Sequence, residues 1–171
     1  GDADLMPIRN LAHLRTLSIG YFFGNDKLTH AAVEHLTGLP NLEELHLTGA
    51  SIADAGLERL ASLKKLRRLN LFRTKITDAG LAHLAALADL EYLNLGLTGV
   101  TSVGLSPLKG LKNLEWLSLE STLVTDDGIR HIEGLPKLSS LNLKGTKVGG
   151  TGLVRLKSVL QLRHLVLDYM D

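Results

Sequence analysis

Histidine and glutamate are the side chains in this sequence that suit proton transfer or metal binding, and their spacing limits both roles. Three histidines recur at one constant interval, at His35, His83 and His131. If they occupy one position in alternate layers of a repeated structure, with roughly 10 Å per helical layer, they lie too far apart to share a metal ion, so we expect surface residues. Glu44 and His46 would share one face of a strand as an acid–base pair, but no nucleophile accompanies them.

Motifs that carry catalysis in other proteins do not occur in this sequence. It has no phosphate-binding glycine loop, no zinc-protease motif and no nucleophile elbow. It has no cysteine, which excludes disulfides and thiolate metal ligands. Threonines recur at regular intervals, and we interpret them as a ladder of hydroxyls that satisfies backbone groups in turns. They are Thr74, Thr98, Thr122 and Thr146. We therefore expect no enzyme activity, no cofactor and no metal.

Arginine and aromatic residues are enriched at the centres of protein interfaces, and here they too recur at a regular interval. Arg68, Tyr92 and Trp116 would be neighbours about 5 Å apart if successive units place them on adjacent strands. Phe72 and Glu120 would lie diagonally close to them. This pattern favours a contact patch for another macromolecule. Cross-strand aromatic pairs also stiffen an exposed sheet, and that structural interpretation stays open beside the binding one.

A basic segment is the second candidate feature. It contains six cations with no acid between them, namely Lys64, Lys65, Arg67, Arg68, Arg73 and Lys75. A solvated rim is one interpretation, and an electrostatic dock for an acidic peptide, a phosphate or a nucleic-acid backbone is the other. The chain as a whole has 19 basic and 18 acidic residues, so no global field favours nucleic acid or a membrane. We therefore expect a protein or peptide partner rather than a nucleic acid.

All of these positions are set by an internal repeat. The string Leu-x-x-Leu-x-Leu returns with one constant period, beginning at Leu42, Leu66, Leu90, Leu114, Leu138 and Leu162. A further copy, with Leu14, Leu17 and Ile19, precedes the first of these at a longer interval. Its unit therefore carries four extra residues, which we place within residues 21–27. The insertion either contributes to a binding surface or covers the end of the core, and the sequence favours neither.

Within each unit the hydrophobic period changes. The Leu-x-Leu core alternates apolar and polar residues, which is typical of a short strand with one buried face. After it, Leu81, Leu84 and Leu87 recur at helical spacing, and Asp78 is predicted to be the helix N-cap. The same cap position is held in other units by Asp54, Ser102 and Asp126. Three glycines are predicted to end these helices with positive φ, namely Gly38, Gly110 and Gly134.

Stacked units of this kind share one continuous core, because a single strand and helix cannot bury their leucines alone. Helices need about 10 Å of lateral room whereas strands need roughly 4.8 Å, so the strands should line the inside of an arc. The sequence thus predicts an α/β solenoid shaped as a curved horseshoe. Its parallel sheet would form the concave face and its short helices the convex face.

The pattern resembles the leucine-rich repeats over essentially the whole chain. Residues 69–81 follow the order Leu-x-Leu-x-x-Thr-x-Ile-Thr-Asp-x-Gly-Leu, and residues 117–129 repeat it closely. This subtype is similar to repeats of bacterial and protozoan proteins and of F-box adaptor subunits, with threonine where many members have asparagine or cysteine. The resemblance implies adaptor work as one possible role, although the chain contains no separate set of F-box helices.

We expect a single domain over residues 1–171 with seven strands. Residues 2–5 align with residues 78–81, so the chain begins at a helix start, midway through a unit, and we expect a fragment of a longer array. No apolar run is long enough for a membrane span, and no signal peptide is visible. The compartment therefore stays open.

Our leading prediction is a protein-binding scaffold that uses its concave sheet face. The residues expected to contact the partner lie on or just past the strands, with one in the insertion. They are Arg68, Phe72, Arg73, Tyr92, Trp116, Glu120 and Tyr21. The alternative prediction is a structural spacer or a regulatory repeat segment of a larger receptor, adaptor or enzyme.

Overall fold

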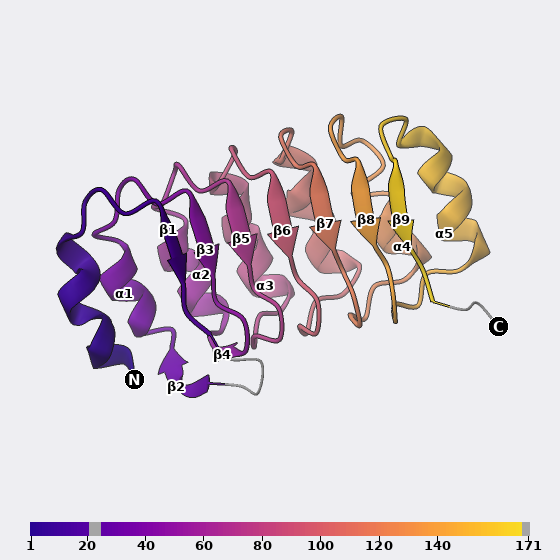
Figure 1. Ribbon diagram of the computed structural model, residues 1–171. Coiled ribbons are helices and arrows are strands. Elements are labelled where there is room, and N and C mark those ends of the chain that lie inside the picture. Colours follow the sequence, from indigo (N-terminus) through magenta and orange to yellow (C-terminus); the bar gives the residue numbers. More distant parts are fainter. Residues whose placement is uncertain (21–24, 169–171) are drawn as a thin grey trace.

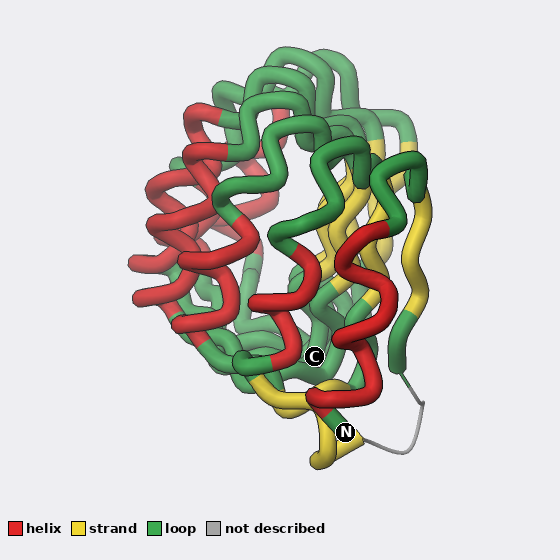
Figure 2. Tube along the Cα trace, turned by 90° about the vertical axis from the view of Figure 1, so that its left-hand side faces the viewer, coloured by secondary structure: helices red, strands yellow, loops and turns green. Residues whose placement is uncertain are grey.

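The computed structural model describes residues 1–20 and 25–168, and its main feature is one parallel sheet with helices behind it (Figure 1). Strand order in this seven-stranded sheet follows the chain. The strands are β1 (Thr16–Ser18), β3 (Glu44–His46), β5 (Arg68–Asn70), β6 (Tyr92–Asn94), β7 (Trp116–Ser118), β8 (Ser140–Asn142) and β9 (His164–Val166). A view turned by 90° places strands and helices on opposite sides (Figure 2). The predicted α/β solenoid is confirmed.

The register of the sheet pairs equivalent residues of successive repeat units. Leu45 pairs with Leu69 and Leu69 with Leu93, and the same sequence offset holds between each later pair of neighbouring strands. Between β1 and β3 the offset is longer, because Leu17 pairs with Leu45. Equivalent residues of successive units therefore stand side by side, and each row of the sheet face can be read from the sequence.

The four extra residues belong to the first unit, as predicted. Part of that segment forms β2 (Asn25–Thr29), which pairs in parallel with β4 (Ala50–Ser51) in a separate two-stranded sheet. Residues 21–24, which include Tyr21, lie outside the described residues.

The helical side consists of short helices of two kinds. The α-helices are α1 (Ala32–Leu36), α2 (Asp54–Leu60), α3 (Asp78–Leu81), α4 (Asp126–Ile129) and α5 (Gly150–Arg155). The 3-10 helices are η1 (Asp2–Asn10), η2 (Ala82–Ala86), η3 (Val103–Gly110) and η4 (Leu156–Ser158). Pro7 and Pro107 lie inside η1 and η3, where the missing N–H of proline disfavours a regular α-helix.

The core runs without interruption through the stacked units. Leu69, Leu93 and Leu117 are fully buried at the centre of the sheet, and the helix leucines Leu84 and Leu108 are fully buried as well. All five belong to one cluster of buried side chains that extends along the array. The stability of one unit therefore depends on its neighbours.

The predicted threonine ladder is confirmed. In each of four units the threonine hydroxyl donates to the carbonyl three residues earlier, at 2.6–2.7 Å. The pairs are Thr74 with Leu71, Thr98 with Leu95, Thr122 with Leu119, and Thr146 with Leu143. These hydroxyls satisfy carbonyl groups just past the strands, where burial would otherwise leave a polar group without a partner.

The prediction that Asp78 caps its own helix is wrong. Thr77 is the N-cap of α3, and it makes no side-chain cap bond. The Asp78 carboxylate instead accepts two hydrogen bonds from Thr101 in the next unit, one from the backbone N–H at 2.7 Å and one from the hydroxyl at 2.6 Å. A Cβ on Gly104 would stand only 2.1 Å from Asp78 Oδ1. The Thr-Asp-x-Gly motif is therefore a clamp between neighbouring units.

Asp54 and Asp126 also lie one residue past the N-cap, whereas Ser102 is the N-cap of η3, as predicted, but makes no side-chain cap bond. Asp54 accepts from Thr77, Ser102 bonds to Thr125, and Asp126 accepts from Gly149 and Thr151. Each of these bonds joins one unit to the next along the helical side. We refer to this column of bonds as the inter-unit clamp.

The predicted positive φ at the helix-ending glycines is also wrong. Among the described residues, the left-handed region is occupied just past the strands instead, at Gly49, Arg73, Leu97, Ser121 and Gly145. These residues follow one another at the repeat interval and share one turn. The turn directs the chain from the sheet toward the helices, and three of the five units make it without glycine.

Candidate functional site

The central row of the sheet face brings together three of the predicted contact residues. The rings of Tyr92 and Trp116 are stacked, with centroids 4.1 Å apart and planes inclined by 8°. The Arg68 guanidinium lies over the other face of Tyr92, with Cζ 4.6 Å from the ring centroid. The register places the three residues side by side on β5, β6 and β7. The sequence therefore predicted their proximity correctly.

Arg68 is fixed from its other side by an acid. Its Nε donates to Glu44 Oε1 at 3.1 Å, and His46 Nε2 lies 2.8 Å from the same oxygen. The hydrogen bond with His46 lowers the pKa of the Glu44 carboxyl, partial burial opposes this, and Arg68 adds to the lowering. Burial raises the pKa of the Tyr92 hydroxyl. The row is thus a connected series of charged and aromatic groups.

Phe72 and Glu120 lie just past the carboxyl ends of their strands. The Phe72 ring packs over Gly96, where an added Cβ would stand 2.8 Å from the ring. Glu120 Oε2 accepts a hydrogen bond from Asn142 Nδ2 at 3.1 Å. Arg73 occupies the left-handed turn with φ of 57°, and the predicted contact Tyr21 lies outside the described residues. The predicted contacts therefore divide into a central row and a strand-end group.

Cations of the basic segment pair with groups of the neighbouring units. Arg67 is paired with Glu91 of the next unit, whereas Arg68 is paired with Glu44 of the preceding one. Lys65 likewise reaches back, to Asn41 Oδ1 at 2.6 Å. Acids one repeat away thus pair with two of the six cations, which favours the solvated rim over the electrostatic dock for these two arginines, and the dock stays a prediction for the segment as a whole.

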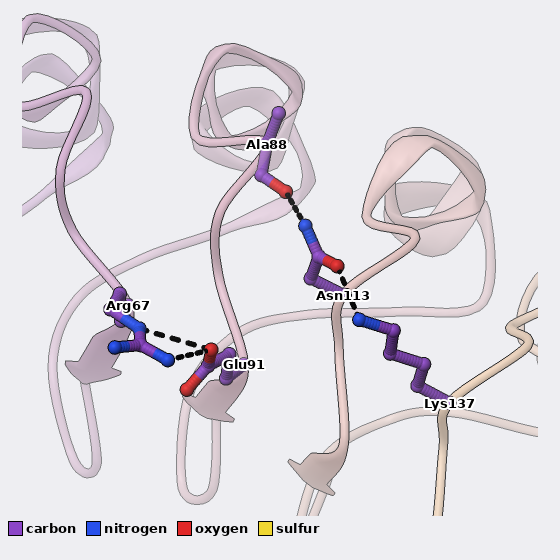
Figure 3. A network of polar contacts seen from close by, with 5 residues as sticks. All are labelled: Arg67, Ala88, Glu91, Asn113 and Lys137. Atoms are coloured by element: carbon purple, nitrogen blue, oxygen red, sulfur yellow. Dashed lines mark hydrogen bonds and ion pairs between the residues drawn. The ribbon is translucent and has the colours of Figure 1, made fainter.

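A polar rim at the strand starts was missed by the sequence analysis. Asn113 Nδ2 donates to the Ala88 carbonyl at 3.2 Å, and Lys137 Nζ donates to Asn113 Oδ1 at 2.8 Å (Figure 3). The same figure shows the Arg67–Glu91 pair at neighbouring strand starts. The signal was present in the sequence, because the side chains that pair stand one repeat apart.

Two hollows lie along this rim. The first, of about 500 Å³, is lined by Arg15, Glu43, Lys65, Arg67, Asp89, Glu91 and Asn113. The second, of about 450 Å³, is lined by Glu115, Pro136, Lys137, Ser139, Gln161, Arg163 and His164. The first hollow lies toward the start of the array and the second toward its end. Glu115, which lines the second hollow, directly precedes Trp116.

The histidines form no ligand set in the described part of the chain. No group of three or more His, Asp or Glu residues within residues 1–20 and 25–168 is arranged to hold a metal ion. The predicted surface placement of His35, His83 and His131 holds in part, because all three are partly buried. Burial lowers the pKa of His131, and its buried Nδ1 has no hydrogen-bond partner within the part of the chain that the structure describes.

Comparison with known protein families identifies the family. Models of the leucine rich repeat match residues 38–61, 62–85 and 88–148. The chain belongs to the leucine-rich-repeat proteins. Leucine-rich-repeat domains in general mediate protein–protein interactions and are typically not enzymes. The bacterial, protozoan or F-box-like subtype stays a prediction.

Solved leucine-rich-repeat structures share this fold. Internalin F from Listeria monocytogenes aligns over 97% of this chain and 51% of its own, with 22% identity and a TM-score of 0.65. Internalin C2 from the same organism aligns over 98% of this chain and 84% of its own, with 22% identity and a TM-score of 0.60. The chain thus spans about half the length of the internalin F structure, and the likeness shows the fold alone.

Curated proteins offer no match to this leucine-rich-repeat chain. Within residues 1–20 and 25–168, no helix is long and apolar enough to cross a membrane.

Proposed function

We propose that this leucine-rich-repeat chain is a protein-binding scaffold whose concave sheet face carries the contact surface. The centre of the surface is the row Arg68, Tyr92 and Trp116. Phe72, Arg73 and Glu120 contribute at the strand ends, and Tyr21, which lies outside the described residues, is a further proposed contact. The observation that carries the proposal is the stacked Tyr92–Trp116 pair, held partly exposed on neighbouring strands of a continuous sheet.

Two physical features support this location. Tyrosine, tryptophan and arginine are the side chains that contribute most to interface hot spots. The sheet fixes them in advance, so these side chains lose less conformational entropy on binding than they would on a mobile loop. The one acid–base pair that the sequence analysis placed on this face, Glu44 with His46, is joined to Arg68 rather than to a nucleophile, which favours a binding role over a catalytic one.

The test is a pull-down from native lysate with the wild-type chain and a Tyr92→Ala/Trp116→Ala variant, read by mass spectrometry. A matched control removes two exposed valines from helices, Val103→Ala/Val154→Ala, whose exposed fractions are 76% and 60%. We expect a protein retained by the wild type and the control and lost by the aromatic variant, at equal melting temperature. If all three chains retain the same proteins, the sheet face is not the contact surface, and the chain acts as a spacer.

A further inference from the structure

A third hollow lies where the helices of two neighbouring units end. It has a volume of about 260 Å³ and is lined by Lys109, Lys112, Arg130, Glu133 and Gly134. Lys109 belongs to η3 and Lys112 follows that helix, whereas the other three residues follow α4. None of the five belongs to a strand of the sheet face. We call this place the three-cation hollow.

The three cations of this hollow form no ion pair with an acid in residues 1–20 and 25–168. Glu133 is the one acid of the lining, and it pairs with Arg155 of the next unit at 3.7 Å. It does not pair with Lys109, although the two hold equivalent positions in neighbouring units. The lining therefore has an excess of two positive charges.

This excess of positive charge does not continue along the helices. Arg59 on α2 is paired with Glu34 at 2.8 Å, and Arg155 on α5 is the arginine that pairs with Glu133. A nucleic-acid backbone requires a longer series of cations that follows its phosphates. A single small anion is therefore the better complement of this hollow.

His131 lies beside the hollow, between Arg130 and Glu133 in sequence. Its buried Nδ1 has no hydrogen-bond partner in the described part of the chain, which is uncommon for a buried polar atom. Burial lowers the pKa of His131 most, Lys109 and Arg130 lower it further, and Asp127 and Glu133 raise it. An anion bound to Lys109 and Arg130 would offset their effect. The charge state of His131 therefore reports what occupies the hollow.

We propose that the three-cation hollow binds one phosphate group, either as free phosphate or on a phosphorylated side chain of a partner protein. Such a group carries about 1.5 to 2 negative charges at neutral pH, which matches the excess charge of the lining. Arg130 donates paired hydrogen bonds to two phosphate oxygens, and Lys109 and Lys112 act as point charges from the preceding unit. A carboxylate has one charge and fewer acceptor atoms, so it complements the hollow less well. This site goes beyond the proposed function, because it lies off the sheet face.

The experiment follows the histidine Hε1 signals of the whole chain by NMR in pH titrations, at an ionic strength held constant with sodium chloride. The chain has seven histidines, and the signal that is missing from His131→Gln identifies His131. The probes are inorganic phosphate and a pentapeptide with phosphoserine between two pairs of glycines, with serine and glutamate versions of the peptide. We expect phosphate or the phosphopeptide to raise the pKa of His131 and the glutamate peptide to bind about 10-fold more weakly. The tighter of the two phosphate probes identifies the source of the group.

Variants with unchanged melting temperatures locate the site. Lys112→Gln/Arg130→Gln should weaken binding of the phosphate probe about 10-fold or more. The matched control Lys75→Gln/Lys147→Gln removes two exposed lysines elsewhere and should weaken it less than about 2-fold. Glu133→Gln should tighten binding about 2- to 3-fold, because it removes the acid of the lining. A gain of binding cannot result from damage to the fold.

Three results would overturn the proposal. They are a pKa of His131 that neither phosphate probe raises, equal binding of the glutamate peptide, and equal loss of binding in the site variant and the lysine control. A twelve-nucleotide single-stranded DNA that binds about 100-fold more tightly than either phosphate probe would also overturn it, in favour of a surface for polyanions. The Tyr92→Ala/Trp116→Ala variant should bind the phosphate probe as the wild type does, so failure of the sheet face and failure of the hollow are distinguishable.

Discussion

Replacing Asp78 by alanine tests whether the inter-unit clamp stabilises the array. The carboxylate accepts hydrogen bonds from the Thr101 N–H and the Thr101 hydroxyl, at 2.7 and 2.6 Å, in a partly buried site. Hydrogen bonds to a charged group contribute about 1.5 to 3 kcal/mol each, and partial exposure places the sum near the lower end. We therefore expect Asp78→Ala to lower the free energy of unfolding by about 2 to 4 kcal/mol.

The chain supplies its own control for this substitution. Ser102 stands at the equivalent position of the next unit, and its hydroxyl lies 2.9 Å from the Thr125 N and 3.0 Å from the Thr125 hydroxyl oxygen. Asp78→Ser should therefore cost less than Asp78→Ala, about 1 kcal/mol. Urea unfolding followed by far-ultraviolet circular dichroism measures both variants.

A double-mutant cycle separates the clamp from capping of the helix that Asp78 begins. If Asp78 bonds to Thr101, then Asp78→Ala and Thr101→Val are coupled by about 1 kcal/mol or more. If Asp78 stabilises only α3, the two effects add within roughly 0.5 kcal/mol. Additive effects would refute the clamp.

Four other substitutions test separate parts of the fold. Leu117→Ala, at a fully buried position, should lower the free energy of unfolding in urea by about 2 to 5 kcal/mol. Leu97→Gly should raise the free energy of unfolding by about 0.5 to 1 kcal/mol, because Leu97 has φ of 53°. Gly145→Ala should lower the free energy of unfolding, because Gly145 has φ of 66° and an added Cβ would stand 2.8 Å from Ser121 Oγ. An unchanged stability in both variants would contradict backbone strain at this turn. Hydrogen bonds from Thr151 and then Gly149 lower the pKa of Asp126 in the folded state. The contribution of this carboxylate to folding stability is therefore fully present above the unfolded carboxyl pKa of about 3.9, and it is lost as the pH falls through the lower pKa of the folded state. The melting-temperature difference between wild type and Asp126→Ala should accordingly be larger at pH 6 than at pH 2, and an equal difference at both would contradict it.

The regular spacing of the leucines was enough to predict the fold and the proximity of Arg68, Tyr92 and Trp116. In a parallel sheet with a constant offset, residues at equal spacing must stand on one row. The partner of each polar side chain was harder to predict. Asp78 has the sequence of a helix cap, yet the extended residue at the helix start is Thr77. Asp78 therefore already lies past the capping position, and its carboxylate bonds to Thr101 of the next unit.

The acidic partners of the basic segment were hard to predict for a related reason. Neighbours in sequence such as Arg67 and Arg68 point to opposite units, so each meets an acid one repeat away, Glu91 in one case and Glu44 in the other. Charge counted along the chain therefore says little about charge on the surface of a solenoid. Comparing the charge at each position with the charge at the equivalent position of the next unit would have found both ion pairs, Arg67 with Glu91 and Glu44 with Arg68. The left-handed turn at Leu97 had no such signal, because leucine rarely adopts positive φ.

The geometry of the aromatic pair follows from the backbone rather than from the rings. Tyr92 and Trp116 lie 4.1 Å apart with their planes inclined by 8°, close to the roughly 4.8 Å that separates neighbouring strands. The strand register sets that spacing, and the inter-unit clamp joins the same units along the helical side. Arg68 stands on the adjacent strand and lies over the other face of Tyr92. Equal spacing on three neighbouring strands therefore produces a stack of three side chains, because the register aligns them in one row.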